Sequence, residues 1–100
     1  MDRTIVTKHG EKRMRERVGV PKAATKRMAQ LAYENGLRRD EVSGSLGRYF
    51  DAEFFHDGSA NNVRIWSGKV WIFSDNRLVT VVGIPAKYKK TVEKIWKEKR

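Results

Sequence analysis

Hydrophobic residues follow a helical spacing over the first half of the chain and alternate with other residues over much of the second half. Before residue 60 they recur three or four positions apart, which is typical of helices with one buried side. After Ala60 they recur at every second position, which is typical of strands. The pattern predicts an α+β fold in which N-terminal helices pack on one face of an antiparallel meander of three or more strands, followed by a C-terminal basic helix.

Two helices are expected in the first third of the chain. The first covers residues 10–18 and offers little apolar surface, because few apolar residues support Met14. Pro21 suits the first turn of the second helix, and Asn35-Gly36 suits a left-handed stop at its end. The buried stripe of the second helix is expected to consist of Ala24, Met28, Leu31 and Ala32.

A third helix is expected before the sheet and a fourth after it. Asp40 is the expected cap of the third helix, which ends near residues 56–58. Its apolar residues at helical spacing are Val42, Leu46, Tyr49, Phe50 and Phe54. Pro85 ends the sheet, and the last helix is expected to bury one side and expose its lysines. The buried side consists of Tyr88, Val92, Ile95 and Trp96.

The strand pairing follows from the two turns. Ser67-Gly68 suits a two-residue hairpin loop, and residues 74–77 are expected to form a four-residue connection. The first loop pairs Trp66 with Lys69, Ile65 with Val70, Arg64 with Trp71 and Val63 with Ile72. The second pairs Phe73 with Leu78, Ile72 with Val79, Trp71 with Thr80 and Val70 with Val81.

In this register the two faces of the sheet differ in chemistry. The aliphatic face, expected to pack on the helices, consists of Val63, Ile65, Val70, Ile72, Val79 and Val81. The other face carries basic residues interleaved with tryptophans, which suits stacking of bases and contact with phosphates of a single strand. An alternative is that the last helix covers this face as a second small core. The expected nucleic-acid-binding residues are Arg64, Trp66, Lys69 and Trp71 on this face, with Lys12 and Arg15 on the first helix.

The charge supports a polyanionic partner. The formal net charge is +10, and most of the 22 lysines and arginines lie in two blocks, at residues 8–27 and 87–100. Concentrated positive charge is typical of nucleic-acid binding, so RNA is the expected partner. Binding of the last helix to an anionic membrane is disfavoured, because a domain of this size needs that helix's apolar stripe in its own core.

Composition narrows the remaining classes. The chain has no cysteine, which excludes disulfides and thiolate catalysis. It shows neither a signal peptide nor an apolar run long enough to span a membrane, so a cytoplasmic protein with one domain over residues 1–100 is expected. Glu53 and His56 have one metal-ligand spacing but lack partners, so we expect no metal and no cofactor.

A candidate catalytic set lies at the start of the first helix. His9, Arg13 and Arg17 are spaced to share one side of that helix, and Lys8 precedes them. Histidine suits proton transfer near neutral pH, and the cations suit a charged phosphorane, as metal-free RNA cleavage requires. The alternative is that His9 packs at a helix start while the arginines form a solvated surface.

Residues 7–9, which open the basic helix, and the meander at residues 61–66 and 79–82 together resemble the barnase, EndoU, colicin D and RelE superfamily of small metal-independent ribonucleases and toxins. The resemblance is nearest to the colicin D type of tRNase domain. It implies helices before an antiparallel sheet, cleavage of RNA such as tRNA, and a Lys-His element at Lys8 and His9. Ser67, Thr80 or Trp71 would then stand for the strand contribution. The spacing of His9, Arg13 and Arg17 also resembles small uncharacterised proteins of phages and mobile elements.

The sequence therefore predicts an RNA-binding protein that acts as a toxin-like, metal-independent endoribonuclease, which is a hydrolase. The expected catalytic residues are Lys8, His9, Arg13, Arg17 and Thr80. One alternative is a non-catalytic nucleic-acid-binding module. Another is a phage or mobile-element accessory protein that acts on a host partner, and an inhibitory protein partner would suit a toxin.

Overall fold

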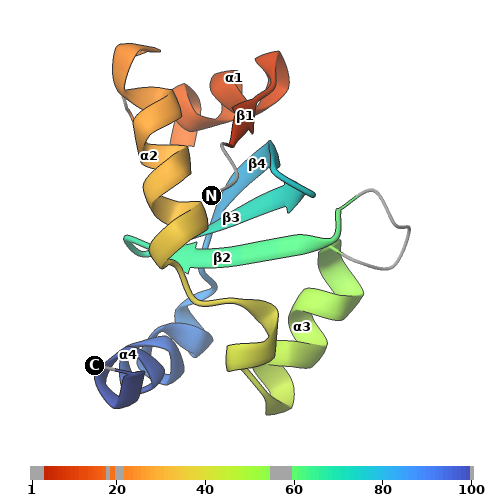
Figure 1. The fold of residues 1–100 in the computed structure, drawn as a ribbon. Coiled ribbons are helices and arrows are strands. Elements are labelled where there is room, and N and C mark those ends of the chain that lie inside the picture. The colour runs from red at the N-terminus through yellow and green to blue at the C-terminus, as the bar shows by residue number, and fades with distance from the viewer. Residues whose placement is uncertain (1–3, 18, 20–21, 55–59, 100) are drawn as a thin grey trace.

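The computed structural model describes residues 4–17, 19, 22–54 and 60–99, and it describes only the backbone of residues 9, 13, 17, 22 and 23 (Figure 1). The fold is α+β, with a four-stranded mixed sheet of order β1-β4-β3-β2. The elements are β1 (Ile5–Val6), α1 (Lys8–Arg17), α2 (Lys22–Asn35), the 3-10 turn η1 (Arg39–Glu41), α3 (Gly44–Phe54), β2 (Asn62–Trp66), β3 (Lys69–Ser74), β4 (Arg77–Gly83), η2 (Ala86–Tyr88) and α4 (Lys89–Lys99).

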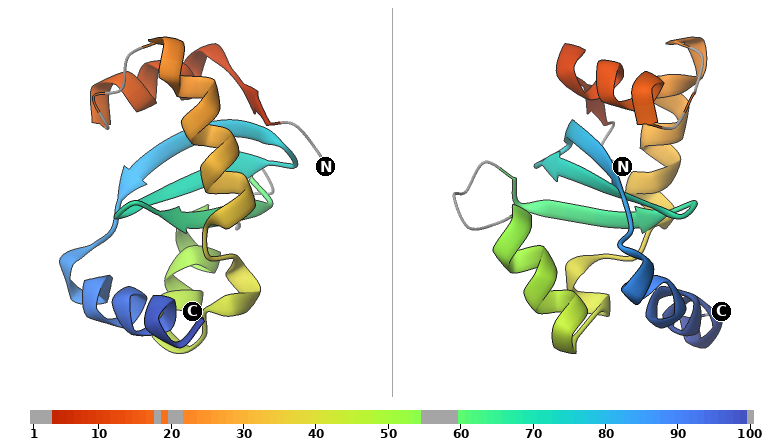
Figure 2. Two further views of the ribbon diagram at one scale, coloured as in Figure 1. Left: turned by 60° about the vertical axis from the view of Figure 1, so that its left-hand side comes forward. Right: turned by 180° about the vertical axis from the view of Figure 1, so that it is seen from behind.

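Helices cover both faces of the sheet, so the expectation that the N-terminal helices pack on one face is only partly correct (Figures 1 and 2). Helices α1 and α2 lie on one face, and α3 and α4 lie on the other. The reason is that both faces are apolar. One contributes Trp71, Phe73, Leu78 and Val81 to the core under α1 and α2, and the other contributes Val63, Ile65, Val70 and Ile72 to the core against α3 and α4.

The sheet also contains a strand that the sequence analysis did not predict. β1 pairs in parallel with β4, aligning Ile5 with Arg77 and Val6 with Leu78. A two-residue strand carries too short a pattern to be recognised by alternation. Its Ile5 N–H donates to the Asn76 carbonyl at 2.8 Å, so β1 also holds the turn between β3 and β4. The antiparallel meander predicted for β2, β3 and β4 is therefore one part of a mixed sheet.

The first hairpin has the predicted register at all four predicted pairs. Ser67 and Gly68 form the turn with φ of 53° and 74°, which is the backbone twist that two-residue hairpins favour. At Ser67 this positive φ is adopted by a residue with a side chain. The local signal of the turn was therefore sufficient to align β2 with β3.

The second hairpin differs from the prediction. Its turn is two residues long, because Ser74 pairs with Arg77. The side chain of Asn61 forms two hydrogen bonds with Asp75, donating to its carboxylate and accepting from its backbone N–H. The predicted pairing of Phe73 with Leu78 is confirmed. A β-bulge at Val79 then shifts the other pairs by one residue. The resulting pairs are Ile72 with Thr80, Trp71 with Val81 and Val70 with Val82.

This one-residue shift moves side chains of β4 between the faces of the sheet. Strand residues alternate between faces, so a single extra residue reverses every later side chain of that strand. Val81 is consequently fully buried beside Trp71 under α1 and α2, while Thr80 is paired with Ile72 on the opposite face. The predicted neighbours Trp71 and Thr80 therefore point in opposite directions.

The helices agree with the sequence analysis in number but differ in detail. Among the described side chains of α2 the buried residues are Thr25, Ala29 and Ala32. The predicted stripe is therefore confirmed at Ala32, whereas Ala24, Met28 and Leu31 are only partly buried. Asp40 lies inside η1 and does not cap α3, which begins at Gly44. The predicted end of the third helix at residues 56–58 lies outside the described residues.

Helix α1 is fixed tightly to β4. The Thr7 hydroxyl donates to the Leu78 carbonyl at 2.9 Å and accepts from the Gly10 N–H at 3.0 Å, which caps the helix and ties it to the strand. Met14, one turn after Gly10, is completely buried. A Cβ atom at Gly10 would lie 2.5 Å from the Leu78 carbonyl oxygen, so this close approach requires glycine.

Replacing Gly10 by alanine tests this contact. Helix propensity alone would make the change stabilising by about 1 kcal/mol, whereas the clash with the β4 backbone forces α1 to move. We expect the free energy of unfolding in urea to fall by about 1–3 kcal/mol. The control is Lys12→Ala, at an exposed position of the same helix. A Gly10→Ala protein more stable than the wild type would contradict the close packing of α1 on β4.

Candidate nucleic-acid interface

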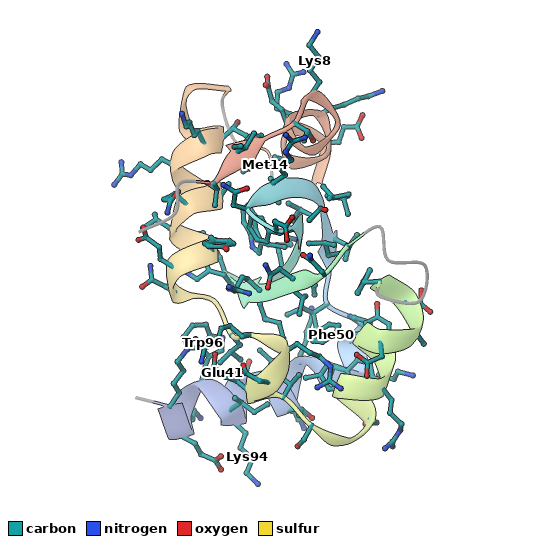
Figure 3. All side chains as sticks on the ribbon, turned by 45° about the vertical axis from the view of Figure 1, so that its right-hand side comes forward. Lys8, Met14, Glu41, Phe50, Lys94 and Trp96 are labelled. Carbon is teal, nitrogen blue, oxygen red and sulfur yellow. The ribbon has the colours of Figure 1, made fainter. Side chains whose placement is uncertain are left out.

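Helix α1 contributes little to the core and presents its cations to solvent. Lys8, Lys12 and Arg15 are exposed, and Figure 3 shows Lys8 extending away from the molecule. Lys12 forms a long ion pair with Glu16 at 4.0 Å. Lys8 and Arg15 form no ion pair or side-chain hydrogen bond within the part of the chain that the structure describes. The positive charge of this helix is therefore weakly compensated and available to a ligand.

The backbone of residues 9, 13 and 17 lies in α1, so the predicted helical spacing of this set is present. The side chains of His9, Arg13 and Arg17 lie outside the described residues. Their catalytic assignment stays a prediction, as does that of Lys8. His56, the other histidine of the chain, also lies outside the described residues.

The expected open face of arginine and tryptophan does not exist, because α1 and α2 cover it. Trp71 has no exposed surface and Arg64 only 8 %. Thr80 lies on the opposite face through the bulge. Arg64 is on β2, whereas α1 packs on β4. Strand β3 lies between β2 and β4, which places these two strands about 10 Å apart. The chain therefore does not assemble Arg64, Trp71 and Thr80 into one cleft beside α1.

The Arg64 side chain instead caps the C-terminal end of helix α2. Its Nε–H donates to the Tyr33 carbonyl in the last turn of that helix, and Nη1 donates to the Val63 carbonyl, both at 2.9 Å. The guanidinium lies 4.7 Å from the centre of the Tyr33 ring. Burial lowers the pKa of Arg64. A cation at this position satisfies the Tyr33 carbonyl at the C-terminal end of the helix and is favoured by the helix dipole.

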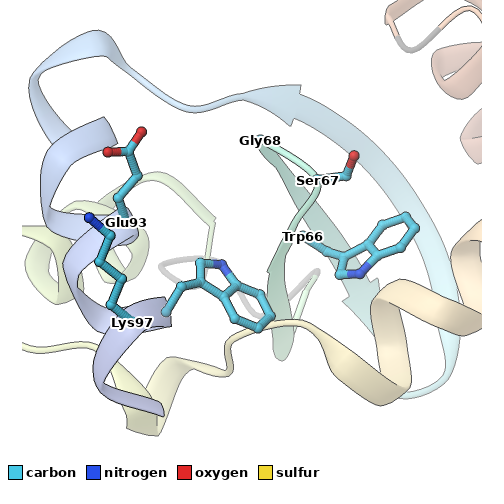
Figure 4. A pocket seen from close by; sticks show the side chains of 6 residues that line it. Trp66, Ser67, Gly68, Glu93 and Lys97 are labelled. Carbon is cyan, nitrogen blue, oxygen red and sulfur yellow. The ribbon is translucent and has the colours of Figure 1, made fainter. Parts of the chain in front are cut away.

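Trp66 and Lys69 are partly exposed at the end of the first hairpin, unlike Arg64 and Trp71. The Trp66 ring packs edge-on against Trp71 with 5.8 Å between centroids, and the Trp71 Nε1–H donates to the Trp66 carbonyl at 2.9 Å. The outer side of this hairpin end borders a groove of about 470 Å³ (Figure 4). The groove is lined by Trp66, Ser67, Gly68, Glu93, Trp96 and Lys97.

The sequence analysis assigned no groove here. It expected Trp96 to lie on the buried side of the last helix, and Trp96 does pack against the aliphatic core, partly buried. What it missed is that α4 runs past the β2–β3 turn and brings Glu93 and Lys97 to Trp66. A tryptophan on the last helix and a glycine-containing hairpin turn were the available signal, but whether they border one groove depends on which face α4 covers.

The second basic block lies on the other side of the sheet from the first. Lys89, Lys90, Lys94 and Lys97 are exposed on α4, and Figure 3 places Lys94 at the end of the molecule opposite Lys8. The Lys99 ammonium pairs with Glu41 at 3.0 Å. Partial burial raises the pKa of Glu41, but the Arg38 N–H and the Lys99 ammonium outweigh it, so this pKa is lowered overall. The chain therefore has two separate basic surfaces.

The described residues include no group of three or more histidines, aspartates and glutamates that could hold a metal ion. Within the same residues, no helix combines the length and apolarity needed to cross a membrane.

Replacing Arg64 by methionine separates a structural role from a binding role. Loss of the bonds to two carbonyls is expected to lower the free energy of unfolding in urea by about 1–3 kcal/mol. The matched control is Arg48→Met, at an exposed position of α3, which should change stability little. If Arg64→Met kept the stability of the control but lost RNA affinity, Arg64 would be an RNA contact and the capping role would be wrong.

Comparison of the chain with protein-family models, with curated proteins and with solved structures finds no match. The proposals that follow therefore rest on the residues and geometry of this chain.

Proposed function

We propose that the protein binds RNA and that helix α1 makes the principal phosphate contacts. The observation that carries this proposal is a helix anchored to the sheet with three exposed cations, of which Lys8 and Arg15 lack close partners among the described residues. Thr7, Gly10 and Met14 hold the helix on β4, while Lys8 and Arg15 make no ion pair within the described chain. A rigid array of cations binds a polyanion with little ordering cost, and each phosphate contact releases counterions.

Weak pairing distinguishes Lys8 and Arg15 of α1 from the arginines around η1, though not from the exposed lysines of α4. Around η1, Arg38 pairs with Asp40 and Glu41, and Arg39 pairs with Asp51 through two bonds of 2.9 and 2.8 Å. Arg39 thereby links η1 to α3. Lys8 and Arg15 make no such link among the described residues, so their place on one helix is better explained by a ligand.

Neutralising α1 tests RNA binding. We expect Lys12→Gln combined with Arg15→Gln to weaken binding of a fluorescein-labelled single-stranded RNA and to reduce the slope of log affinity against log salt by roughly 1 to 2. The readout is fluorescence anisotropy over a series of salt concentrations.

The matched control is Lys90→Gln combined with Lys94→Gln, which removes the same charge from α4 on the other side of the sheet. Equal losses in the two double variants would show that net charge alone attracts RNA and would contradict a site on α1. Binding by the wild type that is absent or insensitive to salt would contradict the proposed function.

A second candidate function is metal-independent endoribonuclease activity. It is favoured by the positions of residues 9, 13 and 17 on successive turns of the anchored helix, beside the exposed Lys8. In this reaction the RNA 2′-hydroxyl attacks the adjacent phosphorus, the bond to the 5′-oxygen breaks, and a 2′,3′-cyclic phosphate and a 5′-hydroxyl result. His9 would transfer a proton at one of the two oxygens, and the cations would stabilise the phosphorane. The resemblance to small toxin ribonucleases also supports this candidate.

Incubation of the protein with total RNA in EDTA tests cleavage. We expect the wild type to generate fragments that end in cyclic phosphate, and His9→Ala to lower the rate by about 10²–10⁴-fold, the usual contribution of general acid–base catalysis. RNA binding by anisotropy should persist in His9→Ala, which controls for loss of the fold. Cleavage that continues unchanged in His9→Ala, or no cleavage by the wild type, would contradict the enzymatic candidate and leave RNA binding in place.

A further inference from the structure

The groove between the β2–β3 turn and helix α4 lies apart from the basic surface of α1 (Figures 1 and 4). A second hollow of about 330 Å³ shares Gly68, Glu93 and Trp96 with it and extends along α4 to Lys89. The groove and this hollow form a continuous depression alongside α4. The space is sufficient for a flat ring of nucleobase size, which is smaller than the drug-sized ligands that pockets of 300–1,000 Å³ accommodate.

Both tryptophans of the groove are fixed in place although neither is fully buried. Trp66 packs against the buried Trp71, which is itself bonded to the Trp66 carbonyl. Trp96 packs against the aliphatic core, and the Lys99 ammonium lies 5.5 Å from the centre of its ring. Trp66 thus packs on the α1 and α2 side of the sheet and Trp96 on the α3 and α4 side, and Figure 4 shows the Trp66 ring directed away from the α4 side. The Trp96 indole, held by the aliphatic core, is therefore the stacking surface of the groove, and it has little conformational entropy to lose on binding.

The polar residues of the groove suit a base attached to a phosphate. Lys97 and Glu93 are exposed one helical turn apart and form no ion pair with each other or with any other described residue. Lys97 can therefore meet a phosphate. Glu93 repels phosphates from its own part of the rim and can accept an N–H of a base edge. The arrangement favours a ligand with its flat ring against the Trp96 indole and its phosphate toward Lys97.

We propose that this groove holds an unpaired base of single-stranded RNA, stacked on the indole of Trp96, with the adjoining phosphate at Lys97. The choice of RNA rests on the proposed function, whereas the stacking site rests on the groove itself. Bases in a duplex are paired and stacked on each other, so only an unpaired base can enter. Every base has a flat π surface, so stacking here is tolerant of sequence.

The test compares lysines on the same helix. Lys94 and Lys97 are both exposed on α4, but only Lys97 lines the groove. We expect Lys97→Gln to weaken binding of labelled oligouridylate several-fold in fluorescence anisotropy, and Lys94→Gln to have a clearly smaller effect. Oligouridylate should quench tryptophan fluorescence, and an RNA duplex of the same length should quench it much less.

Substitution of the indole provides an independent measurement. We expect Trp96→Leu to lower the affinity for oligouridylate by about fivefold to a hundredfold, which is the range for removal of one stacking aromatic residue. Trp96→Phe, which keeps an aromatic ring, should recover part of that loss. Thermal unfolding of both tryptophan variants shows whether the fold is kept. The lysine variants do not need this control, because the side chains of Lys94 and Lys97 are exposed.

The outcomes separate this site from the proposed function. RNA binding without fluorescence quenching, and with equal effects of Lys94→Gln and Lys97→Gln, would overturn the groove and leave RNA binding by α1 intact. Equal quenching by duplex and single strand would also overturn it. Failure to bind RNA, combined with quenching by uridine monophosphate that Lys97→Gln weakens, would overturn the proposed function and retain the groove as a nucleotide site. Absence of both binding and quenching would overturn both.

Discussion

Burial of both faces of one small sheet is the constraint on which the rest of this structure depends. One face carries Trp71, Phe73 and Leu78 and the other carries short aliphatic chains, so neither can be left to water. Helices α1 and α2 are needed on the first face, and α3 and α4 are needed on the second (Figure 2). Each helix then has little apolar surface to spare, and the charged residues gather at the outer sides of the two helical layers.

This arrangement explains why the positive charge forms two surfaces. Helix α1 is held by a cap, a glycine contact and the buried Met14, and its Lys8, Lys12 and Arg15 are exposed. Helix α4 is held by Val92 and by partly buried aromatic and aliphatic residues, and its lysines lie on the other side of the sheet. The groove beside Trp66 forms where α4 passes the end of the first hairpin. The proposed phosphate surface and the proposed base site are thus products of how the two layers close over the sheet.

The difference between the expected and the observed site lies in one residue of β4. The analysis of the strands assumed uninterrupted alternation from Leu78 onward, and the bulge at Val79 reverses the alternation. Thr80 thereby leaves the face that it was expected to share with Trp71, and Val81 replaces it in the core. The interpretation of Arg64 and Trp71 as an open stacking surface failed for a related reason. A tryptophan on a strand suits both a core and a binding surface, and only its neighbours in space distinguish the two.

Features that depend on residues close together in the chain were predictable here. The end of the second helix at Asn35, the register across Ser67-Gly68 and the buried side of α4 at Val92 follow from short-range patterns and are present. The left-handed conformation expected at Asn35-Gly36 is not present, because neither residue has a positive φ. Four features were not predictable from the sequence: the pairing of β1 with β4, the bulge in β4, the face that each helix covers, and the position of Trp66 and Lys97 beside one groove. These depend on which distant segments bury which surfaces. Which segment buries which surface is determined by packing over the whole molecule, and a local sequence pattern does not contain this information.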